Sequence, residues 1–421
     1  MGNFLNLVYD NWDSETTYRP NLENVFGVNR LKILDGLIRF YELHDKMKAS
    51  KIQDVYDNPN ENYYYFINPN GNGEYLFENR DDLGLIPEVE KCFIKCKNFF
   101  IIYLNEHEYE RISYIRLIDQ RAKEKSYDLK RIYVINNDSR IYEYKQKLNT
   151  EINVYALEFL LKFIAGHLSN VHNKFKPEKE GKFFLCHNRS HKPHRYTLLV
   201  LLKNSGLISD VDWSLIMGWN RVENIKRGHL AENFYEPFFN KDELDYYKNE
   251  IEYFDSIDIK KSHYEEDTTW FTAGDLSPEF DWKDIYELKS FEESYINIVT
   301  ESNYFTDCVH ITEKSIKPFH FHQIPIFLSS PNHVKYFKER YDFDFFDDII
   351  DHSYDSEVDN KKRMYLVFNE IKRVLGNKEQ IIEFYKNNQE RFEKNKLKVS
   401  AIHNSKRDIN FFNSLINKNL I

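Results

Sequence analysis

The stretch Phe99-Phe-Ile-Ile-Tyr-Leu104 decides the fold class of this chain. Six consecutive apolar residues without polar alternation are typical of a strand that is buried on both faces. A second such run, Arg-Ile-Tyr-Val-Ile, covers 131–135, and the aromatic run Tyr63–Ile67 precedes both. Segments with helical spacing, among them Asn29–Met47, are expected between them. Buried strands that alternate with helices predict an α/β protein with a parallel sheet.

The second half of the chain repeats this alternation. Strands are expected at 183–186, 295–299 and 324–328, and helices at 196–202, 361–374, 378–394 and 408–416. The longest apolar stretch, Ile152–Leu168, carries polar interruptions, so it predicts an amphipathic helix and no membrane span. Residues 170–182 contain Pro177 and Gly181 and are expected to be a linker, and residues 226–290 an irregular insertion. We therefore expect an N-terminal α/β domain over 1–172, a second over 183–400, and a C-terminal helix in 401–421 that packs back on the first domain.

The net charge of the chain argues against one class of function, the binding of nucleic acid mainly through its phosphates. The 421 residues include 58 Lys and Arg against 68 Asp and Glu, a net charge of −10, whereas a protein that holds nucleic acid by its phosphates normally has the opposite balance. A local basic groove remains compatible with this charge. Four dispersed cysteines form no disulfide framework, and the N-terminus does not have the pattern of a signal peptide. The expected location is the cytoplasm.

A basic loop follows the strand predicted at 183–186. Within nine residues, 187–195, it contains two Arg, one Lys and three His, and a helix is expected to begin near His194. Guanidinium groups beside a helix N-terminus suit the oxygens of a phosphate. The alternative is a solvated basic loop with no ligand. The candidate residues here are Asn188, Arg189 and Arg195.

Two further polar clusters follow the strand predicted at 295–299. Thr300-Glu301 ends that strand, and Thr312 is a good helix N-cap with Glu313 and Lys314 in the first turn. A carboxylate there can accept from sugar hydroxyls, and Lys314, with Lys317 one turn further on, can reach a phosphate. The alternative is an ordinary cap with an exposed ion pair. A third segment, residues 351–355, either binds an acceptor or caps the helix that follows it.

The segment Ile311-Thr-Glu-Lys314, with its short helix and the strand Ile324-Pro-Ile-Phe-Leu328, resembles the donor-site motif of α1,3-fucosyltransferases. The region 294–355 is similar to phage and large-virus glycosyltransferase-like proteins, which combine Val-Thr-Glu, Thr-Glu-Lys-x-x-Lys-Pro and Asp-x-Ser-Tyr-Asp. In this chain those patterns are Val299-Thr-Glu301, Thr312-Glu-Lys-Ser-Ile-Lys-Pro318 and Asp351-His-Ser-Tyr-Asp355. The resemblance covers roughly residues 183–355.

This resemblance implies a GT-B glycosyltransferase, with two Rossmann-like domains facing across a cleft. The C-terminal domain would bind a nucleotide-sugar donor, with Glu313 on the ribose and sugar, and Lys314 with Arg189 or Arg195 on the diphosphate. The acceptor would be a hydroxyl of a glycan, a protein or a hydroxymethylated DNA base, and a viral protein of this kind would act in the host cytoplasm. Where the family has small residues, this chain has His320-Phe-His-Gln323, so hexose, pentose and fucose remain open as the donor sugar.

The expected mechanism follows from charge. Fixed Arg and Lys groups stabilise the departing diphosphate, so no metal or other cofactor is expected. The alternative ligands for a metal are the pairs Asp210-x-Asp212 and Asp342-x-Asp344. An inverting transfer also needs a base, for which Glu106 is the first candidate and Glu108 the second, because both follow the strand at 99–104. The competing interpretation of both is a solvated acidic turn.

Two functions from other classes compete with a transferase. A non-catalytic protein that binds a nucleotide or phosphate would use the same cationic cluster without transferring a sugar. A structural interaction protein would instead use its aromatic side chains, 33 Phe and 30 Tyr among them, as an interface. Ligand-induced stabilisation separates these two, because any ligand specific to the native state raises the melting temperature.

Overall fold

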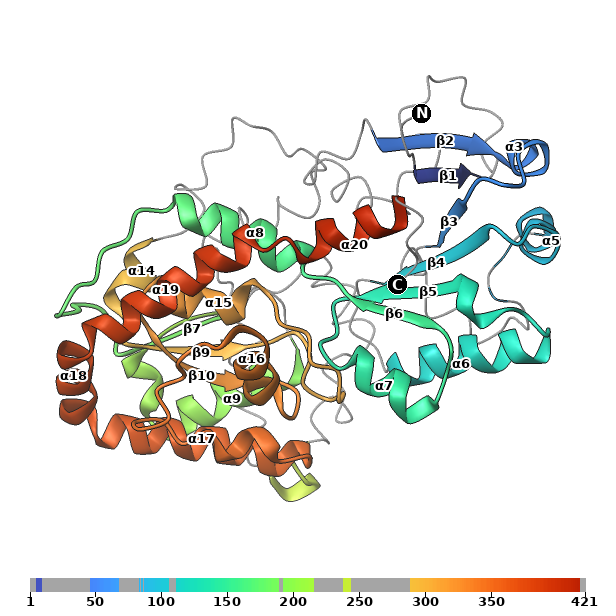
Figure 1. Ribbon diagram of the computed structural model, residues 1–421. Helices are drawn as coiled ribbons and strands as arrows, with labels where there is room; N and C mark the ends of the chain where they lie inside the picture. Colours follow the sequence, from blue (N-terminus) through green and yellow to red (C-terminus); the bar gives the residue numbers. More distant parts are fainter. Residues whose placement is uncertain are drawn as a thin grey trace. The chain divides into compact units, whose positions relative to one another are not determined.

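The computed structural model describes residues 5–9, 46–67, 83, 85, 87–105, 111–188, 192–215, 238–243 and 288–416 (Figure 1). The chain forms two compact units. Unit 1 consists of Met1–Phe159 and Ser405–Ile421, and unit 2 consists of Leu160–Asn404. Each unit contains its own parallel sheet. The predicted α/β class with two Rossmann-like sheets is therefore confirmed.

Unit 1 has a six-stranded sheet in the order β2-β1-β3-β4-β5-β6, and every neighbouring pair is parallel. Its strands are β1 (Leu5–Tyr9), β2 (Met47–Lys51), β3 (Tyr63–Ile67), β4 (Phe99–Asn105), β5 (Ile132–Asn136) and β6 (Asn153–Ala156). The three strands predicted at 63–67, 99–104 and 131–135 are confirmed as β3, β4 and β5. The helix predicted over Asn29–Met47 lies outside the described residues, except at its end, where β2 begins.

Helices cover both faces of this sheet, which explains its continuous apolar runs. The helices between the strands are α3 (Ile52–Asp57), α5 (Pro87–Lys95), α6 (Arg111–Glu124) and α7 (Ile141–Leu148), with a short 3-10 helix at Leu129–Arg131. Alternate strand residues such as Ile101 and Val134 share a core with α5, α6 and α7. On the other face, the C-terminal α20 (Arg407–Ile416) stacks Phe411 on Tyr155, with ring centroids 4.0 Å apart.

Unit 2 has a four-stranded parallel sheet in the order β10-β9-β7-β8. The strands are β7 (Phe184–Asn188), β8 (Val211–Leu215), β9 (Ile296–Thr300) and β10 (Ile324–Leu328). They confirm the strands predicted at 183–186, 295–299 and 324–328, with shifts of one or two residues. Every residue of β9 and β10 is buried, as a strand packed on both faces requires.

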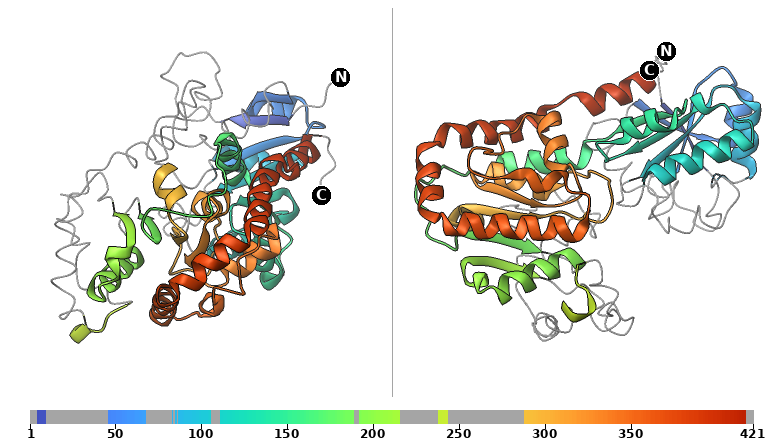
Figure 2. Two further views of the ribbon diagram at one scale, coloured as in Figure 1. Left: turned by 90° about the vertical axis from the view of Figure 1, so that its left-hand side faces the viewer. Right: turned by 90° about the horizontal axis from the view of Figure 1, so that it is seen from below.

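The helices of unit 2 lie on both faces of that sheet. They are α8 (Phe159–Asn170), α9 (Pro193–Asn204), α14 (Leu288–Glu293), α15 (Glu313–His320), α16 (His333–Tyr341), α17 (Asn360–Gly376), α18 (Lys378–Asn387) and α19 (Gln389–Asn404), with 3-10 helices at Leu207–Asp210 and His352–Ser356. Helix α15 packs on α19, and α17 packs on α9 and β10. The short α18 turns the chain between α17 and α19 (Figure 2). Residues 171–182 carry no helix or strand, and Phe175 stacks on Tyr385 of α18 with centroids 4.8 Å apart.

Two predicted helices are wrong in their extent. The stretch Ile152–Leu168 is not one helix, because residues 153–156 pair with β5 as the edge strand β6 and the helix starts only at Phe159. The helix predicted over 378–394 is broken at Asn388, whose φ is −119° and whose side-chain Nδ2 donates to the carbonyl of Phe384 at 2.7 Å. An asparagine that bonds its own backbone in this way competes with the helix. The insertion expected at 226–290 lies largely outside the described residues.

Candidate functional site

The strand order of unit 2 defines a switch point between β7 and β9. From β7 the chain moves to β8 on one side, then crosses to β9 on the other side and continues outward to β10. In open parallel sheets, ligands bind beyond the carboxyl ends of the strands at such a point. Here those ends are Asn188 of β7 and Thr300 of β9. Both residues belong to the candidate set from the sequence.

Side chains join β7 and β9 where their backbones no longer pair. The ladder between them consists of Phe184 with Ile296 and Leu185 with Asn297. Beyond it, the hydroxyl of Thr300 donates to the side-chain oxygen of Asn188, and both residues are buried. This bond holds the two strand ends together at the switch point.

The basic segment that ends in the first turn of α9 is attached to the end of β9. The Nζ of Lys192 donates to the carbonyl of Ser302 at 2.9 Å, and the Nε2 of His194 donates to the carbonyl of Glu301 at 2.9 Å. A terminal nitrogen of Arg195 donates to the carbonyl of Thr300 at 3.0 Å. Arg195 is only 1 % exposed. Burial, together with the positive charges of Arg195 and Lys192, holds the pKa of His194 well below its ordinary value, so its ring is neutral. These three side chains thus fix the backbone that carries Thr300 and Glu301.

The carboxylate of Glu301 is completely buried and surrounded by donors. Its Oε1 accepts from the backbone N–H of Thr312 at 3.3 Å and from the hydroxyl of Ser315. Its Oε2 accepts from the N–H of Ser302 at 3.2 Å and from the hydroxyl of Thr312 at 2.8 Å. The end of β9 is therefore bonded directly to the beginning of α15.

The first turn of α15 carries the exposed part of the site. Thr312 is its N-cap, as predicted, and accepts from the N–H of Lys314 at 3.2 Å. The Nζ of Lys314 lies 2.6 Å from Oε1 of Glu313, and the two side chains are 24 % and 17 % exposed. Lys314 and Glu313 therefore form an ion pair that solvent, or a ligand, can reach.

Both members of this pair are charged at neutral pH. Burial alone would raise the pKa of Glu313, but the ammonium groups of Lys314 and Lys317 outweigh it and lower the pKa to about 2. For Lys314, burial opposes the charge, yet the carboxylates of Glu313 and Glu301 raise its pKa above the ordinary value. A fixed ammonium beside a fixed carboxylate can bind a phosphate oxygen and a sugar hydroxyl together.

The structure brings most of the predicted donor-binding residues together. The residues at this edge of the sheet are Asn188, Arg195, Thr300, Glu301, Thr312, Glu313 and Lys314. Lys317 is buried one turn further along α15, with its Nζ 5.9 Å from the ring centroid of Phe291. Arg189, Glu106 and Glu108 lie outside the described residues.

Sequence reasoning missed a second pair of residues in this network. The hydroxyl of Ser315 lies 3.0 Å from Nε2 of His333, a buried residue of α16. Burial lowers the pKa of His333 to about 4, so it is neutral. The position of Ser315, three residues after the N-cap, was the available signal, because it faces the same end of the helix. Nothing in the sequence indicated His333.

The two Asp pairs that were the alternative metal ligands have protein partners. No group of three or more His, Cys, Asp or Glu that could hold a metal ion occurs in the described part of the chain. In the first pair, Asp210 accepts from Lys378 at 2.7 Å and Asp212 accepts from Ser290 at 2.6 Å. In the second pair, Asp342 accepts from Lys398 at 3.0 Å and Asp344 accepts from Arg391 at 2.6 Å. Each of the four aspartates is thereby bonded to a helix of unit 2.

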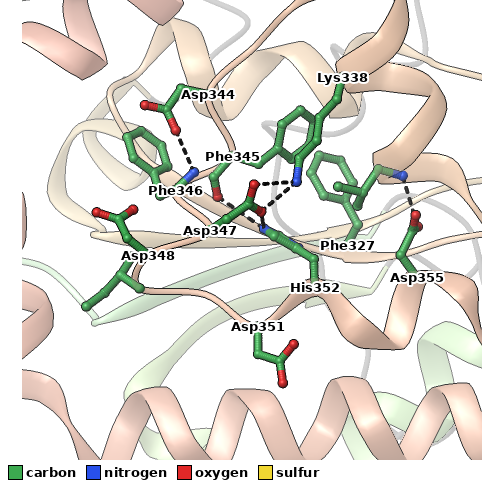
Figure 3. Close-up of polar contacts among 12 residues, drawn as sticks. Phe327, Lys338, Asp344, Phe345, Phe346, Asp347, Asp348, Asp351, His352 and Asp355 are labelled. Atoms are coloured by element: carbon green, nitrogen blue, oxygen red, sulfur yellow. Dashed lines mark hydrogen bonds and ion pairs between the residues drawn. The ribbon is translucent and has the colours of Figure 1, made fainter.

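The segment 351–355 supports a neighbouring loop and helix (Figure 3). The side chain of Asp355 accepts from the N–H groups of Val334 and Lys335 at 2.9 and 3.0 Å, so it caps the start of α16. His352 donates from Nε2 to the carbonyl of Phe345 at 3.1 Å. The helix that Asp355 caps is therefore the preceding α16 and not the following one. The following helix α17 is capped by Asp359, whose side chain accepts from the N–H of Lys362 at 2.7 Å.

Comparisons with known proteins find a weak likeness in structure. No family model and no curated protein matches the chain. Among solved structures, the chain is similar to an α,α-trehalose 6-phosphate synthase from Burkholderia multivorans, with 11% identity, a TM-score of 0.41, and coverage of 93% of this chain and 78% of that chain. An α,α-trehalose-phosphate synthase (UDP-forming) from Burkholderia vietnamiensis gives 12% identity, a TM-score of 0.37, and coverage of 93% and 77%. A likeness this low carries no conclusion about activity or ligand.

In the described ranges, every helix is too short or too polar to cross a bilayer.

Proposed function

We propose that this protein is a glycosyltransferase that moves a sugar from a nucleotide-sugar donor to a hydroxyl acceptor. The observation that carries the proposal is the Glu313–Lys314 ion pair, partly exposed and held at the switch point of a parallel sheet. The resemblance of residues 311–328 to the fucosyltransferase donor motif supports the same assignment.

The donor would bind at the first turn of α15. Lys314 contacts the diphosphate, and Glu313 accepts from hydroxyls of the ribose or the sugar. The N–H groups of Thr312 and Lys314 are already taken by Glu301 and by the Thr312 hydroxyl, so side-chain charge does most of the binding. Asn188, Thr300 and Arg195 would support this turn from below. Lys317, further along α15, and Arg189, which follows β7 in the sequence, would supply further positive charge.

The catalytic effect comes from charge that develops during the reaction. Cleavage of the sugar–phosphate bond leaves negative charge on the departing diphosphate. A fixed ammonium stabilises that charge more strongly in the transition state than in the ground state. Lysine and arginine cations can fill this role without a metal ion. Glu106 or Glu108 would deprotonate the acceptor hydroxyl.

The sugar and the acceptor are further parts of the proposal. Fucose, hexose and pentose donors fit the site chemistry equally. A glycan, a protein and a hydroxymethylated DNA base fit as acceptors, in the cytoplasm of the cell or host. A DNA acceptor would give a gel shift that weakens steeply as salt rises.

A thermal-shift screen against UDP-, GDP-, ADP- and CMP-sugars tests the donor site. We expect at least one class to raise the melting temperature, and Lys314→Ala to abolish that rise. The matched control is Lys378→Ala, since Lys378 has an equivalent ion pair with Asp210, just before β8 at the opposite edge of the same sheet. Full donor binding by Lys314→Ala, or no binding by the wild type, would refute the proposal. Donor binding without transfer or hydrolysis would favour a non-catalytic binding protein.

A further inference from the structure

We propose that Glu301 is a positioning residue that holds Lys314 where the diphosphate of the donor binds. This inference rests on the proposed function and assigns a role to a buried residue of the same site. Glu301 is 0 % exposed. A carboxylate offers about four lone-pair sites, and four protein donors already occupy the two oxygens of Glu301. It therefore acts through the protein and does not contact the ligand.

The connection to Lys314 passes through the hydroxyl of Thr312. That hydroxyl has a single proton, and a carboxylate can only accept, so the proton points to Glu301, with the oxygens 2.8 and 3.0 Å apart. The lone pairs of Thr312 are then directed to Lys314, whose backbone N lies at 3.2 Å and whose Nζ lies at 3.4 Å. The charge of Glu301 thus sets the direction of both bonds to Lys314.

A second contact holds the same turn of the helix. The hydroxyl of Ser315 also donates to Glu301, which leaves its lone pair for Nε2 of His333 at 3.0 Å. The first turn of α15 is therefore tied at two points to one carboxylate on the end of β9. Because β9 lies inside the sheet, between β7 and β10, the partly exposed ion pair rests on a rigid support.

Charge repulsion and positioning predict opposite changes in diphosphate affinity when the charge of Glu301 is removed. A buried carboxylate close to an anion site repels the anion, so its neutralisation should tighten diphosphate binding. Positioning predicts weaker binding, because the Thr312 hydroxyl loses its fixed direction. The sign of the change therefore separates the two roles.

The test compares Glu301→Gln with the wild type, using inorganic pyrophosphate, UDP, GDP and ADP as probes in titration calorimetry. Glutamine keeps the shape of the side chain but replaces one acceptor by a donor. We expect affinity for pyrophosphate and for the bound nucleotide to fall by the same factor, on the order of tenfold. In a Lys314→Ala background, Glu301→Gln should have no further effect on affinity, since the two act through one path.

Asp355→Asn is the matched control, because Asp355 is also a buried carboxylate that bonds the start of a helix of unit 2, here α16. We expect it to lower the melting temperature and leave pyrophosphate affinity unchanged. If Glu301→Gln does not fold, Thr312→Val cuts the same path and Thr312→Ser restores it. A loss of UDP affinity without a loss of pyrophosphate affinity would mean that Glu301 contacts the nucleoside, and this would overturn the inference. Unchanged or tighter binding would also overturn it. Failure of the wild type to bind any probe would instead refute the proposed function itself.

Discussion

At the scale of single residues, the site depends on buried polar groups that satisfy one another across distant parts of the chain. Asn188 and Thr300 are 112 residues apart, yet their side chains bond where the backbone ladder has ended. Because the environment is buried, each partner would pay a desolvation penalty without the other. Loss of either side chain is therefore expected to destabilise unit 2.

Thr300→Val should destabilise unit 2 by about 1–3 kcal/mol, because the side-chain oxygen of Asn188 would lose a buried donor. Urea unfolding followed by circular dichroism measures this change. Thr300→Ser keeps the hydroxyl and is the control, with a smaller expected loss. Equal stability of the valine variant and the wild type would show that the bond contributes nothing.

Some of these residues could be predicted from the sequence and others could not. Thr312, Glu313 and Lys314 form a local cap-and-charge pattern, readable from neighbouring positions. The roles of Arg195 and Glu301 were not readable in the same way. Both carry charge near a strand end and both were expected to face the donor. In the structure, Arg195 donates to the carbonyl of Thr300, and Glu301 accepts from Thr312, the N-cap of α15. Both contacts join groups that are far apart in the sequence, so no local pattern predicts them.

At the scale of elements, α20 completes the core of unit 1 from the far end of the chain. Asp408 is fully buried and accepts from the hydroxyl of Tyr155 at 2.9 Å and from the N–H of Glu158 at 3.1 Å. Arg407 pairs with Glu158 at 2.8 Å, and the hydroxyl of Tyr64 donates to the carbonyl of Leu415 at 3.0 Å. Without this helix, one face of the β3–β6 region would expose its aromatic side chains.

Phe411→Ala should therefore destabilise unit 1 by about 3–5 kcal/mol, the usual cost of removing a buried phenylalanine. Hydrogen exchange resolved by peptide mass spectrometry would show loss of protection in β3, β4, β5 and β6, with unit 2 unchanged. Leu397→Ala, an exposed leucine on α19, is the control and should change neither unit. Loss of protection confined to α20 would contradict a role for this helix in the core.

At the scale of the whole molecule, unit 2 buries several neutral histidines. Burial lowers the pKa of His320 and His322 to about 3. It lowers the pKa of His333 and His352 to about 4, and that of His194 well below the ordinary value. Below about pH 6.5 the unfolded chain protonates these rings while the folded unit does not. Their contribution to stability is thus present at neutral pH and is lost as the pH falls.

We expect the melting temperature of unit 2 to fall between pH 7 and pH 5 in scanning calorimetry. Asp355 opposes this trend, because burial raises its pKa to about 6, so protonation of the folded state favours folding as the pH drops. Five histidines outweigh one carboxyl. Asp355→Asn should steepen the loss and His320→Gln should reduce it. A melting temperature that is constant over this range would contradict the assignment of neutral buried rings.

Local sequence patterns were enough to predict the α/β class, the strands β3, β4, β5, β7, β9 and β10, and the capped start of α15. These features depend on residues close together in the chain, such as an apolar run or a cap, so their physical cause is local. Long-range packing was needed to establish the strand order, the switch point between β7 and β9, the enclosure of Glu301, and the return of α20 to unit 1. Each of these depends on groups far apart in sequence that satisfy one another only once the chain has folded.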